Sequence, residues 1–202
     1  MKKAVLVVSF GTSYKETREK AIKPCEELIA ATFKNYDFYR AYTSDMIIKK
    51  ISRVENIKIS NPIEVLDSLL ATGYEEVVVQ TLHVICGEEY CKLREQVASY
   101  ENRFKKIVLG RPLLSKIEDY NQKKLPVFIG TVKGYPEIDE VIARLRKAEI
   151  KKAYLMPFML VAGNHALKDM VGDEEDSWKS VLEENPAIRQ CFLTHALEAS
   201  RQ

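Results

Sequence analysis

The chain has 202 residues, of which 46% are hydrophobic and 30% are charged, and its formal net charge is +2. Such a chain can bury a sizeable core in one domain or two small ones, and its balanced charge gives no global basic field for nucleic acid. No apolar run approaches the roughly 18 residues of a membrane span, and the N-terminal run is too short for a signal peptide. We therefore expect a cytoplasmic protein without nucleic-acid or membrane partners.

The first expected element is a buried strand over Val5–Phe10, followed by the turn Gly11–Ser13. A helix over Tyr14–Thr32 should follow, with Ser13 as its N-cap and with Pro24 kinking it or ending its first part. A glycine and two hydroxyls at this turn predict an anion site, because backbone N–H groups and the helix dipole converge there. The chain has no Walker A lysine and no G-x-G-x-x-G pattern, so we predict no nucleotide binding.

Strands and helices alternate through the rest of the first half. They are predicted as a strand over Tyr36–Tyr42, a helix after the cap Thr43–Asp45, a helix over Ile63–Ala71, a strand over Val77–Ile85, a helix over Glu88–Arg103 and a strand over Ile107–Gly110. Asn61 and Pro62 start the second of these helices, and Gly73 closes it. This alternation is typical of a doubly wound parallel sheet with right-handed crossovers.

The second half is shorter. After the polar stretch Ser115–Lys124 we expect a strand over Val127–Val132, a helix over Glu137–Ala148, a strand over Ala153–Val161 and a helical tail from Asp176 onward. A half with so few strands has little independent stability, so either it packs against the first half or segments are missing from it. The predicted division is an N-terminal half over 1–114, a linker or shortened region over 115–126, and an incomplete C-terminal half over 127–202.

The two halves share a design. In the second half an apolar run ends at Gly163, and His165 follows two residues later; in the first half Gly87 and Glu89 stand in the same arrangement. Ligands of open α/β sheets bind beyond the carboxyl ends of such strands. We predict an internal duplication and an α/β fold of two similar doubly wound parallel-sheet halves with a cleft between them.

Several motifs extend across nearly the whole chain: KKAVLVVSFGTSYKETREKAI, AYTSDMIIKKI, LHVICGEEY, GYPEIDEVI and LMPFMLVAGNHALKDMVGDEEDSWK. In these motifs the chain resembles the anaerobic sirohydrochlorin cobaltochelatases, a family of class II tetrapyrrole chelatases. The resemblance implies two α/β domains around a tetrapyrrole cleft and association into a small homo-oligomer. It also implies ATP-independent insertion of Co²⁺ into sirohydrochlorin, a step of anaerobic cobalamin biosynthesis.

The resemblance also implies site residues. His165 matches the family's metal-binding histidine in AG-[ND]-HA, and Glu89 matches the acid of G-[DE]-EY. Two features depart from the family pattern: the GHG motif that carries a second histidine is missing, and Lys133 stands where the family has a glutamate ligand. The stretch SVLEENPAIRQ also skips a strand and turn that the family places before ENPAIR. The sequence therefore resembles a cobaltochelatase shortened in two places in its second half.

Metal insertion needs a ligand for the metal and an acceptor for the pyrrole protons. His165 suits both tasks, since imidazole binds first-row ions such as Co²⁺ and accepts protons near neutral pH. Glu89 would accept protons or steer the cation. The substrate's carboxylates and ring would be held by the first turn, whose residues are Phe10, Gly11, Thr12 and Ser13. One alternative is a degenerate tetrapyrrole- or metal-binding module without chelatase activity, and another is an unrelated anion-binding α/β protein.

Other chemically interesting residues receive structural interpretations. His83 is interpreted as a satisfied core residue and His195 as a surface residue of the terminal helix. Basic residues that either frame the pocket mouth or lie on solvated faces are Arg18, Arg40, Lys49 and Lys50. The cysteines are expected to be reduced, buried thiols.

Overall fold

The computed structural model describes residues 1–113, 115, 138–149 and 186–202. The chain divides into two compact units, one of Met1–Ser115 with Phe158–Gln202 and the other of Lys116–Pro157. In the first unit the strands are β1 (Lys2–Ser9), β2 (Asp37–Tyr42), β3 (Tyr74–Thr81) and β4 (Lys106–Gly110). Its helices are α1 (Lys15–Thr17), the π-helical turn Arg18–Ile22, α2 (Lys23–Thr32), α3 (Asp45–Glu55), α4 (Pro62–Ala71), α5 (Glu88–Ala98) and α8 (Pro186–Ser200).

The four strands form one parallel sheet in the order β2-β1-β3-β4. Val5 of β1 lies opposite Phe38 of β2 on one side and Val78 of β3 on the other. The chain leaves β1 toward β2 and later returns past β1 to form β3, so the boundary between β1 and β3 is a topological switch point. The α/β prediction of a parallel, doubly wound sheet is confirmed for this unit.

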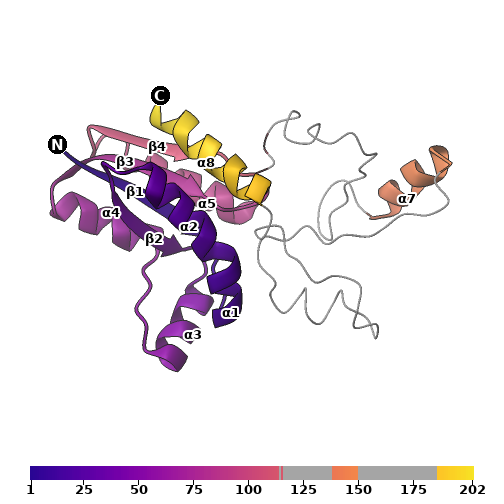
Figure 1. Ribbon diagram of the computed structural model, residues 1–202, viewed down its shortest axis with the longest axis horizontal. Coiled ribbons are helices and arrows are strands. Elements are labelled where there is room, and N and C mark those ends of the chain that lie inside the picture. Colours follow the sequence, from indigo (N-terminus) through magenta and orange to yellow (C-terminus); the bar gives the residue numbers. More distant parts are fainter. Residues whose placement is uncertain (114, 116–137, 150–185) are drawn as a thin grey trace. The chain divides into compact units, whose positions relative to one another are not determined.

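Apolar side chains of β1 supply both faces of the sheet, because successive residues of a strand point to opposite sides. Val5 and Val7 belong to the core that also contains Ile29 of α2 and Phe192 of α8. Leu6 belongs to the opposite core. Figure 1 shows α2 and α8 side by side, and the core residues place α4 and α5 on the other face of the sheet.

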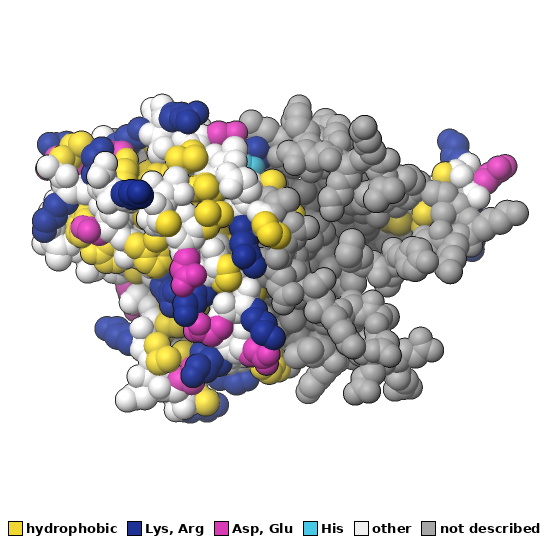
Figure 2. All heavy atoms as spheres, viewed as in Figure 1, with side chains coloured by type: hydrophobic (Ala, Val, Ile, Leu, Met, Phe, Trp, Pro, Cys, Tyr) yellow, Lys and Arg dark blue, Asp and Glu magenta, His cyan; other side chains and the backbone are white. Residues whose placement is uncertain are grey.

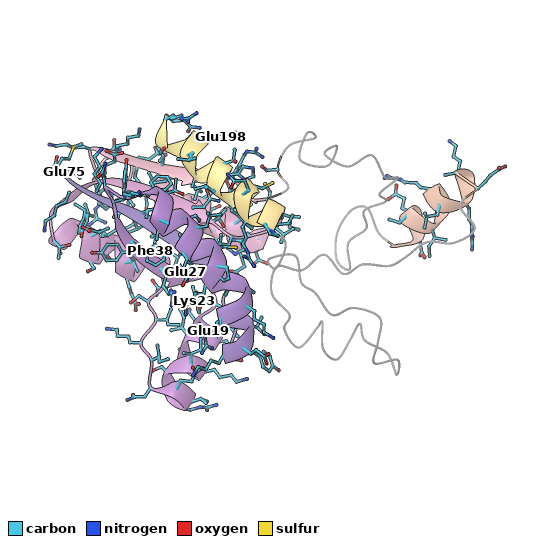
Figure 3. The ribbon with its side chains drawn as sticks, in the orientation of Figure 1. Glu19, Lys23, Glu27, Phe38, Glu75 and Glu198 are labelled. Carbon is cyan, nitrogen blue, oxygen red and sulfur yellow. The ribbon has the colours of Figure 1, made fainter. Side chains whose placement is uncertain are left out.

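The expected helix over Tyr14–Thr32 is present but interrupted. It comprises α1, the π-helical turn and α2, and Pro24 lies in the first turn of α2. Proline is tolerated there because the N–H groups of a helix's first turn need no intrahelical acceptor. Along this helix Glu19, Lys23 and Glu27 follow one another (Figure 3), and the Lys23 ammonium lies 2.6 Å from the Glu19 carboxylate.

The N-cap prediction for Ser13 was wrong. The cap residue is Tyr14, whose side chain makes no cap bond; its backbone N–H donates instead to Thr12 Oγ1 at 3.3 Å. The two later caps are confirmed, since Ser44 accepts from the N–H of Ile47 and Asn61 forms a reciprocal capping box with its helix. Short polar side chains at these positions satisfy helix N–H groups that lack an intrahelical acceptor.

The terminal helix α8 packs on the first sheet, although the sequence placed it in the second half. Phe192, Ala196 and Ala199 recur on one helix face and are buried. His195 on the same face is only 3% exposed, and its Nδ1 lies 3.1 Å from the carbonyl oxygen of Arg111. The surface interpretation of His195 was therefore wrong, because this helix face covers β3 and β4 rather than meeting solvent.

In the second unit the structure describes helix α7 (Ile138–Lys147), predicted as Glu137–Ala148. Acidic residues stand in its first turn and basic residues in its last, which complements the helix dipole. In the first unit, Figure 2 shows basic and acidic side chains interspersed over the described face. None of the helices in the described part of the chain combines the length and the apolarity that crossing a bilayer requires.

Candidate active site at the carboxyl ends of β1 and β3

Backbone hydrogen bonds tie together the segments that follow the strands. The N–H of Leu82, just after β3, donates to the carbonyl of Val8 at 2.7 Å. The N–H of Thr43, just after β2, donates to the carbonyl of Ser9 at 2.9 Å. The carboxyl ends of these strands therefore form one continuous edge at the switch point, the place where open α/β sheets bind ligands.

The turn after β1 requires glycine at position 11. Gly11 has a φ of +86°, and a Cβ built there would overlap the ring of Tyr42. Tyr42 is fully buried at the end of β2, so its ring cannot move aside easily. The large side chains on either side of the turn are accessible, since Phe10 is 45% exposed and Tyr14 37% exposed. Lys50 lies over the Tyr14 ring, with its ammonium 5.8 Å from the ring centroid.

Arg18 fixes the conformation of this turn from the neighbouring helix. Its Nη1 donates to the carbonyl of Thr12 at 3.1 Å, and its Nη2 pairs with the carboxylate of Glu55 at the end of α3. The hydrogen bond from Arg18 lowers the pKa of the Glu55 carboxyl. Arg40, also considered for the pocket mouth, instead donates to the buried Glu26 of α2. Of these two arginines, Arg18 is therefore the one that supports the turn.

His83 lies beyond the end of β3, because that strand stops at Thr81 rather than continuing to Ile85. Its ring Nδ1 is 2.6 Å from Thr81 Oγ1, which also accepts the His83 backbone N–H at 3.2 Å. The carbonyl of His83 accepts the N–H of Leu113 at 3.1 Å. Nε2 is buried and has no hydrogen-bond partner among the described residues. The interpretation of His83 as a satisfied core residue was therefore wrong, because only one ring nitrogen is satisfied.

Glu89 stands in the first turn of α5, where the helix dipole favours an acid. Its Oε1 lies 3.7 Å from the ammonium of Lys92, and its Oε2 is buried with no hydrogen-bond partner among the residues described. Burial lowers the pKa of His83 to about 4, and the negative charge of Glu89 partly opposes that shift. The site therefore combines a neutral imidazole with a nearby carboxylate.

The pKa of His83 predicts a pH-dependent stability. Between its ordinary pKa of 6.5 and the lowered value of about 4, the unfolded chain binds a proton at His83 that the folded chain does not. Stability must therefore fall as pH falls, by about 2 kcal/mol from this group at pH 5. We expect His83→Gln to remove this contribution in urea unfolding at pH 7 and pH 5. A difference between wild type and variant that is the same at both values would contradict the assignment.

The structure describes part of the predicted site. It brings Phe10, Gly11, Thr12 and Ser13 to the same sheet edge as Glu89. His165, Lys133 and the predicted second-half strands lie outside the described residues. Of the cysteines, expected to be buried thiols, Cys25 is buried, whereas Cys86 is exposed and Cys91 and Cys191 are half-buried. No group of three or more His, Cys, Asp or Glu residues that could hold a metal occurs within the described ranges.

Sequence reasoning missed the buried ring nitrogen of His83 that has no hydrogen-bond partner among the described residues. The signal that could have found it is the polar pair Gln80-Thr81, which ends the apolar run of β3 and so marks the end of the strand. A histidine two residues past a central strand lies at the ligand-binding edge rather than in the core.

The structure is that of an α/β protein with a parallel sheet, and it places a glycine turn, an imidazole and a carboxylate at the switch point, where sheets of this kind bind ligands. The sequence model of the family described as cobalt chelatase (CbiK) matches residues 3–124 and 117–198. The chain belongs to this cobalt chelatase family.

Two curated relatives carry the name sirohydrochlorin cobaltochelatase. The protein from Salmonella typhimurium is 38% identical over 255 residues, covering 98% of this chain and 97% of the relative. The protein from Nitratidesulfovibrio vulgaris, named CbiKC, is 25% identical over 227 residues, covering 90% and 80%. Because the first alignment is longer than this chain, it includes stretches of the relative that have no counterpart here. The two family matches overlap at residues 117–124.

Proposed function

We propose that this chain is a sirohydrochlorin cobaltochelatase, which inserts Co²⁺ into sirohydrochlorin in cobalamin biosynthesis. The observation that carries the proposal is the 38% identity to a protein of that name across 98% of the chain. The described geometry supports it, since a neutral imidazole, a carboxylate and a glycine turn with the exposed Phe10 beside it lie at one sheet edge. Imidazole and carboxylate are suitable groups for handling a divalent first-row cation.

His165 is proposed to bind the substrate metal and to accept pyrrole protons. Glu89 assists by drawing the cation to the site and by accepting protons. The turn formed by Phe10, Gly11, Thr12 and Ser13 binds the tetrapyrrole. Its backbone N–H groups and hydroxyls suit the carboxylates at the substrate rim, and the exposed Phe10 ring suits the flat macrocycle.

The remaining parts of the proposal concern the whole protein. Insertion proceeds without a nucleotide, and the protein works as a cytoplasmic homo-oligomer without nucleic-acid or membrane partners. The proposed division is an N-terminal half over 1–114, a linker or shortened region over 115–126 and a C-terminal half over 127–202, whose last helix α8 packs on the N-terminal sheet. The formal net charge of only +2 supports the absence of a nucleic-acid partner.

The test is a spectroscopic assay with sirohydrochlorin and Co²⁺ in the absence of ATP. We expect the absorption spectrum of the metal-free ring to convert to that of Co-sirohydrochlorin faster than in a protein-free control. Quenching of the ring's fluorescence without cobalt incorporation would overturn the proposal in favour of a tetrapyrrole-binding module. Absence of any ring binding would favour an unrelated anion-binding protein.

A further inference from the structure

Arg18 connects the turn that follows β1 to the end of α3. Its Nη1 donates to the carbonyl of Thr12 at 3.1 Å, and its Nη2 pairs with the carboxylate of Glu55, the last residue of α3. The Arg18 side chain is 12% exposed and the Glu55 side chain 19% exposed, so solvent screens this pair only weakly. Because both terminal nitrogens are engaged within the protein, the guanidinium acts on the turn and is not the group offered to a ligand.

Two locally unfavourable features of the chain coincide at this pair. Arg18 is the first residue of the π-helical turn, a rare form of helix that occurs mostly as single turns and often at functional sites. Glu55 ends α3, where the negative pole of the helix disfavours a carboxylate. The hydrogen bond from Arg18 offsets this repulsion, and it lowers the pKa of the Glu55 carboxyl. Features that cost local stability and meet at one contact point to a role for that contact beyond holding a helix.

The contact with Thr12 also fixes the direction of the next peptide group. A trans peptide is planar, with its C=O and N–H pointing in opposite directions. A Thr12 carbonyl directed at Arg18 therefore turns the Ser13 N–H away from the guanidinium. Thr12 is 4% exposed, whereas Ser13 is half-buried and can be reached from solvent. The turn thus presents a backbone donor of fixed direction on the side opposite Arg18.

We propose that Arg18, anchored by Glu55, is a positioning residue that directs the Ser13 N–H to a carboxylate of the bound tetrapyrrole. The assignment of this carboxylate to sirohydrochlorin rests on the proposed function. Glu55 has a second effect, because its charge neutralises the guanidinium and keeps it on the turn instead of on the substrate carboxylates. A donor that is already oriented in the free protein needs no ordering when the substrate binds.

Replacement of arginine by lysine separates charge from geometry. Arg18→Lys keeps the positive charge, but one ammonium nitrogen replaces the two nitrogens that bind Glu55 and the Thr12 carbonyl. Arg40→Lys is the matched control. Arg40 on β2 makes a similar forked pairing with the buried Glu26 of α2, to which its Nε donates at 3.0 Å. That pairing joins β2 to α2 and does not involve the turn.

The first measurement is hydrogen–deuterium exchange of the full chain without ligand, followed at the amides of residues 10–14. We expect Arg18→Lys to speed this exchange about tenfold, which corresponds to the loss of one charge-assisted hydrogen bond. Arg40→Lys should leave it unchanged. Glu55→Gln preserves the size of the side chain, should give a smaller increase, and serves if Arg18→Lys does not fold. Exchange of these amides as slow as in the wild type would overturn the inference.

The second measurement is sirohydrochlorin binding, from the quenching of ring fluorescence, together with the KM and kcat of cobalt insertion. Arg18→Lys should weaken binding and raise KM about tenfold while kcat stays within about twofold of the wild type, because the turn binds the ring without taking part in the chemistry. Arg40→Lys should change neither constant. A lower kcat at unchanged KM, or an equal rise of KM in Arg40→Lys, would overturn the inference.

The two proposals fail in different ways. Ring binding that depends on Arg18 without cobalt insertion would reject only the proposed function. If the wild type binds no ring, faster exchange of the turn in Arg18→Lys would reject the proposed function and keep the positioning role of Arg18. Cobalt insertion with a KM that does not depend on Arg18 would reject only this inference.

Discussion

Replacement of Gly11 by alanine is expected to lower the free energy of unfolding by about 3–4 kcal/mol, through backbone strain and overpacking together. The backbone at this position has a φ of +86°, which a residue with a Cβ rarely adopts. The added methyl group would also overlap the ring of Tyr42, which is fully buried at the end of β2. Urea unfolding of the wild type and variant measures the difference.

Gly73 supplies the matched control for this substitution. Its φ of +79° is nearly the same, but a Cβ built there meets nothing within 4 Å. Gly73→Ala should therefore show the backbone strain without the overlap, at a cost of about 1 kcal/mol. Equal destabilisation by the two substitutions would show that the contact with Tyr42 does not constrain the turn.

Local features of the fold could be predicted from the sequence. The cap segment Thr43–Asp45 and the helix start at Asn61 were identified because a short polar side chain before a helical pattern satisfies N–H groups only a few residues away. The apolar run of β1 was predicted for a similar reason, since strands buried on both faces read as continuous hydrophobic segments. These inferences need only neighbouring residues.

Features that depend on distant residues could not be predicted in the same way. The need for glycine at position 11 comes partly from Tyr42, and the burial of His195 comes from packing of α8 on strands far earlier in the chain. His83 was misinterpreted because its apolar neighbours suggested that β3 continues, whereas the strand ends at Thr81. Its unsatisfied nitrogen appears only once the partners of the other ring atoms are known.

The candidate site also combines local features with one that depends on distant residues. Glu89 and the glycine turn were identified from motif and spacing. They lie at the same sheet edge because β1 and β3 are neighbours in the sheet. Their separation in the sequence gives no direct sign of that pairing. Parallel neighbours require a crossover, so the contact emerges from topology rather than from any local pattern.

Replacement of His165 by alanine is expected to slow Co-sirohydrochlorin formation by at least about 100-fold, because general acid–base catalysis by a positioned side chain contributes on that order. The substitution also removes a proposed ligand of the substrate metal. His195→Gln is the control, because that imidazole is committed to the carbonyl of Arg111. It should lower the unfolding temperature while leaving the rate per folded molecule unchanged. Unchanged turnover in His165→Ala would remove this residue from the mechanism and shift the search for the essential base toward His83 and Glu89.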